Sequence, residues 1–116
     1  MRRLFGKKAE PVRSVDEQDQ MVLDQMRSAG WDMSEHRLIE NLLYFSTRDG
    51  AEHASAELTS LGYRVEVKPG AQGDDWLAQA SRRHVATIEA IRAMRAELTS
   101  IAIARSGEYD GWGAWQ

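Results

Sequence analysis

The spacing of apolar residues along the chain predicts three helices. Apolar residues that recur every three or four positions indicate a helix over 15–29 and another over 86–105. A further helix opens at Thr47 and stops at Gly62. The run Ser14-Val15-Asp16-Glu17 matches a capping box, in which the Ser and Glu side chains satisfy backbone donors of the first turn. The polar side of this first helix is interpreted as a solvated face, which carries Asp19, Gln20, Asp24 and Arg27.

Four other segments have the residue pattern of β-strands. Residues 37–45 are apolar on both alternating sides, which is typical of a central strand covered on both faces. Apolar and polar residues alternate over 63–68, so one side of this strand is expected to be buried and the other exposed to solvent. A third strand is predicted over 76–82, and the short turn-rich link 69–74 makes these two strands a hairpin. The last strand is expected over 108–115.

The order of these elements predicts the fold class. After one extra N-terminal helix, the chain follows the β-α-β-β-α-β order of ferredoxin-like sandwiches, an α+β fold with a four-stranded antiparallel sheet. Right-handed crossovers place both crossover helices on one face of the sheet, so the opposite face is expected to be open. The last strand would be an edge strand with an unpaired row of backbone groups. We assign 14–116 to this single domain and 1–13 to a disordered basic N-terminal tail.

Composition and charge exclude several classes of protein. A chain of 116 residues with a net charge of −3 is expected to form one domain. The absence of cysteine excludes disulfide scaffolds, thiolate zinc sites and cysteine nucleophiles, and it fits a cytoplasmic protein. No apolar run approaches the roughly 20 residues that span a bilayer, and the basic start 1–8 lacks the apolar segment of a secretory signal. No dense basic stripe follows, which argues against sequence-specific nucleic-acid binding.

The residues that could carry catalysis do not form a recognisable site. His53 follows Asp49 by four positions on one helix face, but one histidine and one carboxylate make only two metal ligands. Gly111-Trp112-Gly113 has no helix after it to hold a phosphate, and no serine lies in a nucleophile elbow. We therefore expect a non-enzymatic protein without a metal or cofactor. Two alternatives stay open: a small-molecule-binding regulatory domain of ferredoxin-like type, and a hydrolase built on His53 and nearby carboxylates.

The C-terminal run 108–116 carries large aromatic side chains, whereas chain ends are usually small and polar. As a regular strand it would point Tyr109 and Trp115 to one side of the sheet and Trp112 to the other. These aromatics can fill the core under the sheet. They can also form a contact patch with the neighbouring carboxylates, because Trp and Tyr often anchor protein interfaces. Both interpretations stay open.

The run Glu108-Tyr109-Asp110-Gly111-Trp112-Gly113 resembles the closing motif of the ribonuclease E inhibitor B family, the RraB-like regulators of ribonuclease activity B. Looser similarities precede it in the family's order, at Ala29-Gly30, Asp32, Ile39-Glu40 and Leu61-Gly62-Tyr63. The resemblance extends over most of the predicted domain. It implies a small ferredoxin-like protein that binds the endoribonuclease E and inhibits it without catalysing a reaction.

By this resemblance, ribonuclease E or a related ribonuclease complex is the candidate protein partner, and the role is regulation of RNA degradation. Namesake members continue past the motif into a strongly acidic tail, and the sequence here ends at Gln116. We expect the partner to contact the open sheet face and the C-terminal motif. The candidate contact residues are Glu108, Tyr109, Asp110, Trp112, Trp115, Arg64, Glu66 and Lys68.

Overall fold

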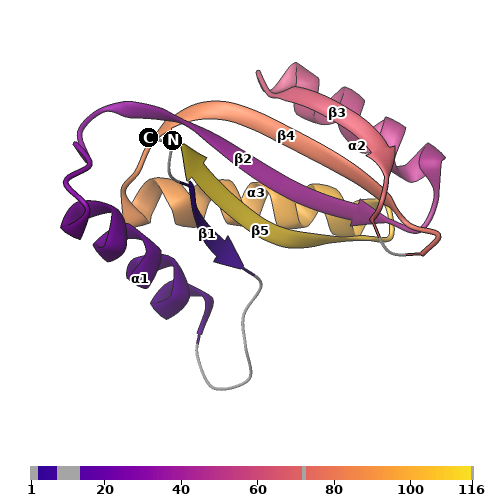
Figure 1. Cartoon of the computed structure of the whole chain (residues 1–116). Coiled ribbons are helices and arrows are strands. Elements are labelled where there is room, and N and C mark those ends of the chain that lie inside the picture. The colour runs from indigo at the N-terminus through magenta and orange to yellow at the C-terminus, as the bar shows by residue number, and fades with distance from the viewer. Residues whose placement is uncertain (1–2, 8–13, 72, 116) are drawn as a thin grey trace.

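One antiparallel sheet carries three helices on one of its faces (Figure 1). The structure is a computed structural model that describes residues 3–7, 14–71 and 73–115, with only the backbone course for 3–7. The elements in chain order are β1 (Arg3–Lys7), α1 (Val15–Ser28), β2 (His36–Phe45), α2 (Arg48–Ser60), β3 (Arg64–Pro69), β4 (Trp76–Val85), α3 (Ile88–Ala104) and β5 (Gly107–Trp115).

The sheet has the order β1-β5-β2-β4-β3, and every neighbouring pair is antiparallel. Within it, β5-β2-β4-β3 is the ferredoxin-like sheet, with the first and third strands of that unit in the middle. Helices α2 and α3 cover one face, and α1 packs beside them against α3 and β1. The predicted α+β fold with an N-terminal helix before the four-stranded unit is therefore confirmed.

Local sequence signals set the helix boundaries. The hydroxyl oxygens of Ser14, Thr47 and Thr87 each accept a hydrogen bond from a backbone N–H three residues on, at 3.1, 3.0 and 3.2 Å. At the end of α1, the Trp31 N–H donates to the Met26 carbonyl across Gly30, whose φ is +86°. This is the Schellman pattern, in which a left-handed residue satisfies the last carbonyls of a helix.

The N-terminal segment differs from its prediction. Residues 3–7 form the strand β1, which pairs along β5 from Arg3 opposite Trp115 to Lys7 opposite Gly111. The expected disordered tail is thus wrong for 3–7, and β5 is an inner strand of the sheet rather than an edge strand. The remaining residues of that prediction, 1–2 and 8–13, lie outside the described residues. The sequence alone does not predict β1, because this strand forms by backbone pairing with β5, at the other end of the chain.

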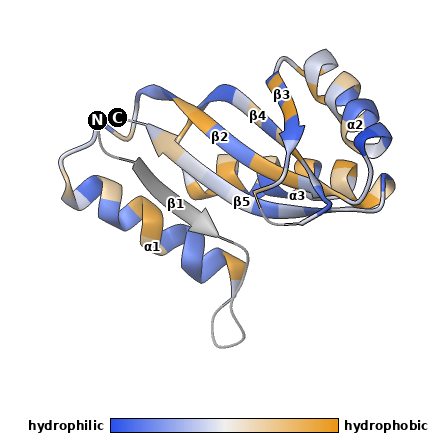
Figure 2. Cartoon of the chain, turned by 45° about the vertical axis from the view of Figure 1, so that its right-hand side comes forward, coloured by the Kyte–Doolittle hydropathy of each residue, from blue (hydrophilic) through white to orange (hydrophobic). Residues whose placement is uncertain are grey.

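The two faces of the sheet differ in how well they are covered. On the helix side of β2, the side chains of Ile39, Leu43 and Phe45 are at most 1% exposed. On the other side, which we call the open face, Leu38 is 42% exposed and Tyr44 is partly exposed. The expectation that β2 is covered on both faces is therefore wrong, whereas the expected open face is present. Figure 2 shows the alternation of apolar and polar residues along these strands.

No helix in the described part of the chain is both long enough and apolar enough to cross a membrane.

Candidate functional site

A β-bulge in β5 decides where the side chains of the C-terminal motif point. Leu43 pairs with Tyr109 and Leu42 pairs with Gly111, so Asp110 is an extra residue on β5. Gly111 has a φ of +134°, a conformation that side chains rarely adopt. The extra residue resets the alternation, so Tyr109 and Trp112 both point to the helix side. The prediction that they point to opposite sides is wrong.

Trp112 is buried in the core and binds a buried ion pair. Its side chain is 0% exposed, and its indole N–H donates to Asp19 Oδ1 of α1 at 2.9 Å. Arg95 of α3 donates to both oxygens of Asp19, from Nε at 3.0 Å and from Nη2 at 2.8 Å. The side chains of Asp19 and Arg95 are 0% and 13% exposed. The interpretation of Asp19 as solvated is therefore wrong.

Tyr109 continues this network across the sheet. Its hydroxyl donates to Asn41 Oδ1 at 2.7 Å, and the Asn41 amide contacts the Ala80 carbonyl at 3.4 Å. The Arg95 guanidinium lies over the Tyr109 ring, 5.1 Å from its centre. Burial raises the pKa of Tyr109 although Arg95 acts in the opposite direction, so the phenol stays a hydrogen-bond donor. The motif thereby connects α1, α3 and three strands.

The burial of Tyr109 and Trp112 removes two of the eight candidate contact residues from the surface. Their side chains are 6% and 0% exposed, so both belong to the core and neither offers a surface to a partner. The core interpretation of these two aromatics is the one that the structure supports. The other six candidates lie outside the core.

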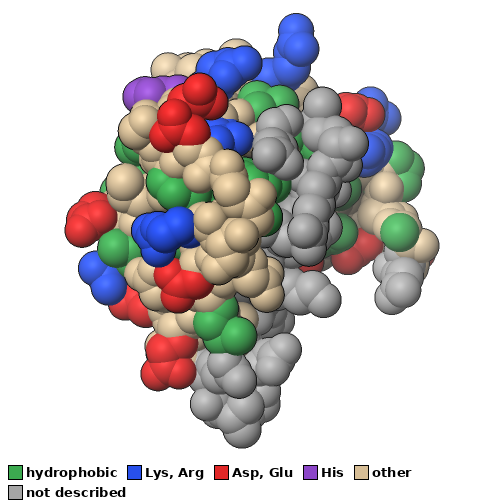
Figure 3. Space-filling view, turned by 60° about the vertical axis from the view of Figure 1, so that its left-hand side comes forward, with side chains coloured by type: hydrophobic (Ala, Val, Ile, Leu, Met, Phe, Trp, Pro, Cys, Tyr) green, Lys and Arg blue, Asp and Glu red, His purple; other side chains and the backbone are tan. Residues whose placement is uncertain are grey.

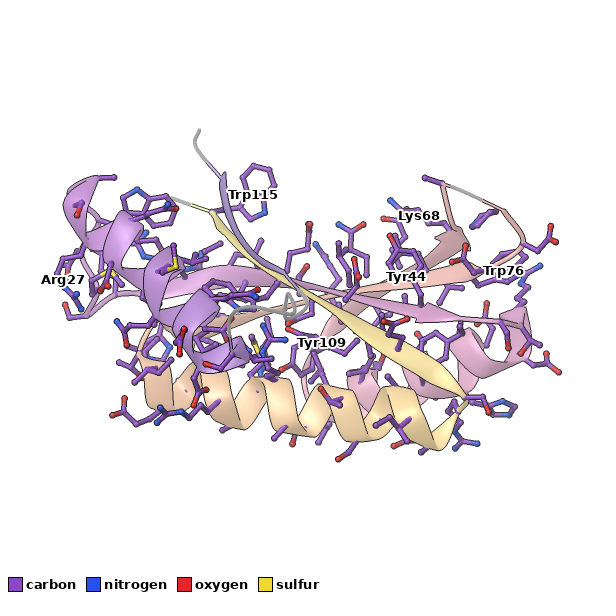
Figure 4. All side chains as sticks on the ribbon, turned by 90° about the horizontal axis from the view of Figure 1, so that it is seen from below. Arg27, Tyr44, Lys68, Trp76, Tyr109 and Trp115 are labelled. Atoms are coloured by element: carbon purple, nitrogen blue, oxygen red, sulfur yellow. The ribbon has the colours of Figure 1, made fainter. Side chains whose placement is uncertain are left out.

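The strand register places four of these six candidates on the open face together with apolar residues. Tyr44 pairs with Glu108 on one side and with Leu77 on the other, and Leu77 pairs with Lys68. One row across the open face thus reads Glu108, Tyr44, Leu77, Lys68. Figure 4 shows Tyr44, Lys68 and Trp115 on the side of the sheet away from α3, and Tyr109 between the sheet and α3.

Two further rows lie beside this one on the open face. The first reads Gly113, Glu40, Ser81, Arg64, and the second reads Gly111, Leu42, Gln79, Glu66. Beyond the Ile39–Ala114 pair, Leu38 and Trp115 follow on their strands, so the last aromatic lies beside Leu38, which is 42% exposed. The open face therefore carries a set of apolar side chains that we call its apolar centre, namely Leu38, Leu42, Tyr44, Leu77 and Trp115, with Glu40 between Leu38 and Leu42. Charged side chains lie along β3, at the start of β5 and at Arg83 of β4.

The electrostatics of this face are mixed. Gln79 donates to the 8% exposed Glu40 carboxylate at 2.6 Å, and Lys68 lies 3.9 Å from Glu66. Burial is the main cause that raises the pKa of Tyr44, and the carboxylates of Asp110 and Asp75 raise it further. Both signs of charge are also interspersed over the described part of the flank that Figure 3 shows.

Two of the histidines contact a backbone carbonyl or a tyrosine hydroxyl. His53 Nδ1 lies 2.9 Å from the carbonyl oxygen of Asp49, in the same exposed helix turn. His84 Nε2 lies 3.3 Å from the Tyr63 hydroxyl, and burial together with nearby Arg82 lowers its pKa to about 4. Within residues 3–7, 14–71 and 73–115, no three His, Asp or Glu side chains are placed to hold a metal ion.

Sequence reasoning missed Asp19, Arg95 and Asn41. A signal for Asp19 exists, because it falls on the apolar side of its helix with Val22, Leu23 and Met26. A carboxylate in such a stripe has to find a partner in the core. Arg95 and Asn41 carry no comparable signal, since their roles depend on elements that meet only in the folded chain.

Comparison with known proteins identifies the family. Residues 16–114 match the family model described as RraB, regulator of ribonuclease activity B. A search of curated proteins finds no match. The matched region runs from the first turn of α1 nearly to the end of β5, and it includes both the buried network and the open face. Because one family model covers most of its length, the chain belongs to the RraB family of regulators of ribonuclease activity.

Proposed function

We propose that this protein is a non-catalytic regulator that binds an endoribonuclease of the ribonuclease E type and lowers its activity. The observation that carries the proposal is the family match over residues 16–114, which spans the whole sandwich from α1 to β5. The match includes the C-terminal motif, whose aromatics hold α1 and α3 to the sheet. Because RNA degradation is a cytoplasmic process, we place the protein there, acting as a single domain with β1 as its outer strand.

The open face is the proposed contact surface for the ribonuclease. It carries Trp115 beside Leu38, and large amphipathic side chains such as tryptophan supply much of the energy of protein interfaces. Charged groups surround this apolar centre and would set the orientation of the partner. Of the residues expected from the sequence, six stay in the proposal: Glu108, Asp110, Trp115, Arg64, Glu66 and Lys68.

The proposal is tested by cleavage of a defined RNA with purified ribonuclease E and increasing amounts of the full chain. Wild type should inhibit with a saturable dose dependence. Leu38→Asp puts a charge into the apolar centre at a 42% exposed position, so the inhibition constant should rise roughly tenfold or more while the fold stays intact. Trp115→Ala should act in the same direction. Circular dichroism checks the fold of each variant.

A matched control lies on the other side of the molecule. Ile103 is a 67% exposed residue on α3, so Ile103→Asp introduces the same charge without touching the open face. It should inhibit as wild type does. Absence of both binding and inhibition by wild type would refute the proposed function. Equal inhibition by wild type and Leu38→Asp would refute the assignment of the surface.

A further inference from the structure

We propose that the open face also binds the open face of a second copy of this chain, giving a symmetric dimer. This inference does not rest on the proposed function, because it concerns only how the chain meets itself. It starts from the exposed apolar centre, where Leu38 is 42% exposed and Leu42, Tyr44 and Trp115 are partly exposed. Exposed apolar side chains gathered on one sheet face commonly mark an interface.

The row Glu108-Tyr44-Leu77-Lys68 is complementary to itself. It has a carboxylate at one end, an ammonium group at the other, and two large apolar side chains between them. A two-fold axis parallel to the strands, between β2 and β4, places β3 of one protomer over β5 of its partner. Lys68 then faces Glu108, and Tyr44 faces Leu77. The symmetry forms each contact twice, as in other isologous interfaces.

The neighbouring rows are complementary in size under the same operation. Arg64 of one protomer faces Gly113 of its partner, and Glu66 faces Gly111. The two glycines are buried and present no side chain. The long side chains of β3 would therefore lie opposite two positions of β5 that carry no side chain.

The known geometry of sheet packing permits this arrangement. Two sheets can pack face to face about 10 Å apart with their strands aligned to within roughly 30°. Long side chains such as Lys68 and Glu108 can reach each other across that distance. All three helices lie on the far side of each sheet and do not obstruct it (Figure 1). A dimer of this kind covers the surface proposed for the ribonuclease, so each protomer could bind only one of the two.

Charge reversal on the full purified chain tests the dimer, with no ribonuclease present. Sedimentation equilibrium should show a concentration-dependent dimer for wild type. Lys68→Glu and Glu108→Lys each place like charges opposite each other, so each should raise the dissociation constant roughly tenfold or more. The double variant restores opposite charges across the axis, and its dissociation constant should return toward that of wild type.

A second variant in the interface and a control outside it separate loss of the dimer from loss of the fold. Tyr44→Asp, which puts a charge opposite Leu77 of the partner, should also weaken the dimer, whereas Ile103→Asp on α3 should not, and circular dichroism shows whether each variant is folded. A wild-type chain that stays monomeric into the hundreds of micromolar would overturn the proposal. So would a dimer that survives both single charge reversals, or one that Ile103→Asp disrupts. None of these three results decides whether wild type inhibits ribonuclease E, so failure of this inference is distinguishable from failure of the proposed function.

Discussion

Asp19 shows at the scale of single residues how a charge is held inside this fold. Its carboxylate has no exposed surface and accepts two hydrogen bonds from Arg95 and one from Trp112. A buried ion pair gives little net stability compared with apolar packing, but removing one partner leaves an uncompensated charge in the core. Asp19 therefore links the C-terminal motif to α1, and removing one of its partners should lower the stability of the fold.

Two arginines of α3 give a matched test of this point. Arg95 binds the buried Asp19, whereas Arg92 binds Asp16 one turn earlier on α1, at a site where both side chains are 54% exposed. Arg95→Ala should lower the free energy of unfolding by about 3–5 kcal/mol, since it leaves the buried Asp19 carboxylate without its cationic partner. Arg92→Ala should lower it by less than about 1 kcal/mol. Urea denaturation measures both, and equal losses would contradict the role of burial.

His84 predicts a pH dependence of stability. Burial is the main cause that lowers its pKa to about 4, with smaller effects of Arg82 and His36 in the same direction. In the unfolded chain the pKa of His84 is near 6.5. Between about pH 4 and pH 6.5 the unfolded chain therefore binds more protons than the folded chain does. The contribution of His84 to stability is therefore fully present above about pH 6.5 and is lost as the pH falls toward 4.

The His84 prediction is measured by denaturant unfolding at about pH 5.5 and about pH 7.5. Wild type should be less stable at the lower pH, and His84→Gln should show a smaller loss because it removes the proton-binding group. His53→Gln changes an exposed histidine and should keep the loss of wild type. An unchanged pH dependence in His84→Gln would show that other groups cause it.

At the scale of elements, the sequence predicted the helices well and the direction of the last side chains poorly. The helices were predictable because capping hydroxyls and terminal glycines act within one or two turns. The alternation in β5 was not, because one extra residue at the bulge moves every following side chain to the other face. Asp110-Gly111 is recognisable as a turn-forming pair, but only pairing with β2 turns it into a bulge.

The bulge predicts a strong effect of a small substitution. Gly111→Ala forces a side chain onto a backbone with a φ of +134°. It should lower the free energy of unfolding by about 1–3 kcal/mol, the typical cost of a residue held in such a conformation. Denaturant unfolding measures the change. A loss below about 0.5 kcal/mol, the usual effect of surface substitutions, would mean that the bulge relaxes without strain.

At the scale of the whole molecule, the strand β1 pairs along β5 and becomes the outer strand of the sheet, and no helix covers the open face. The sequence predicted that this face would carry Arg64, Glu66 and Lys68, and the register places them there, on the same face as Glu108. It left open whether Tyr109 and Trp112 contact a partner or fill the core, and their burial places both in the core. Ribonuclease binding and self-association are proposed for this one face, so both are argued from its apolar centre.

The sequence by itself determined every element except β1, the order of those elements, the ferredoxin-like topology and the family. These depend on periodicity, capping residues and a motif, all of which are local along the chain. Only the tertiary structure decided that β1 joins the sheet, that Asp19 is buried, and which aromatics reach the surface. Those outcomes depend on pairing between segments far apart in sequence, as when Trp112 of β5 meets Asp19 of α1. Residue patterns indicate which side chains prefer burial. Which residues these side chains contact depends on how the elements pack in the folded chain.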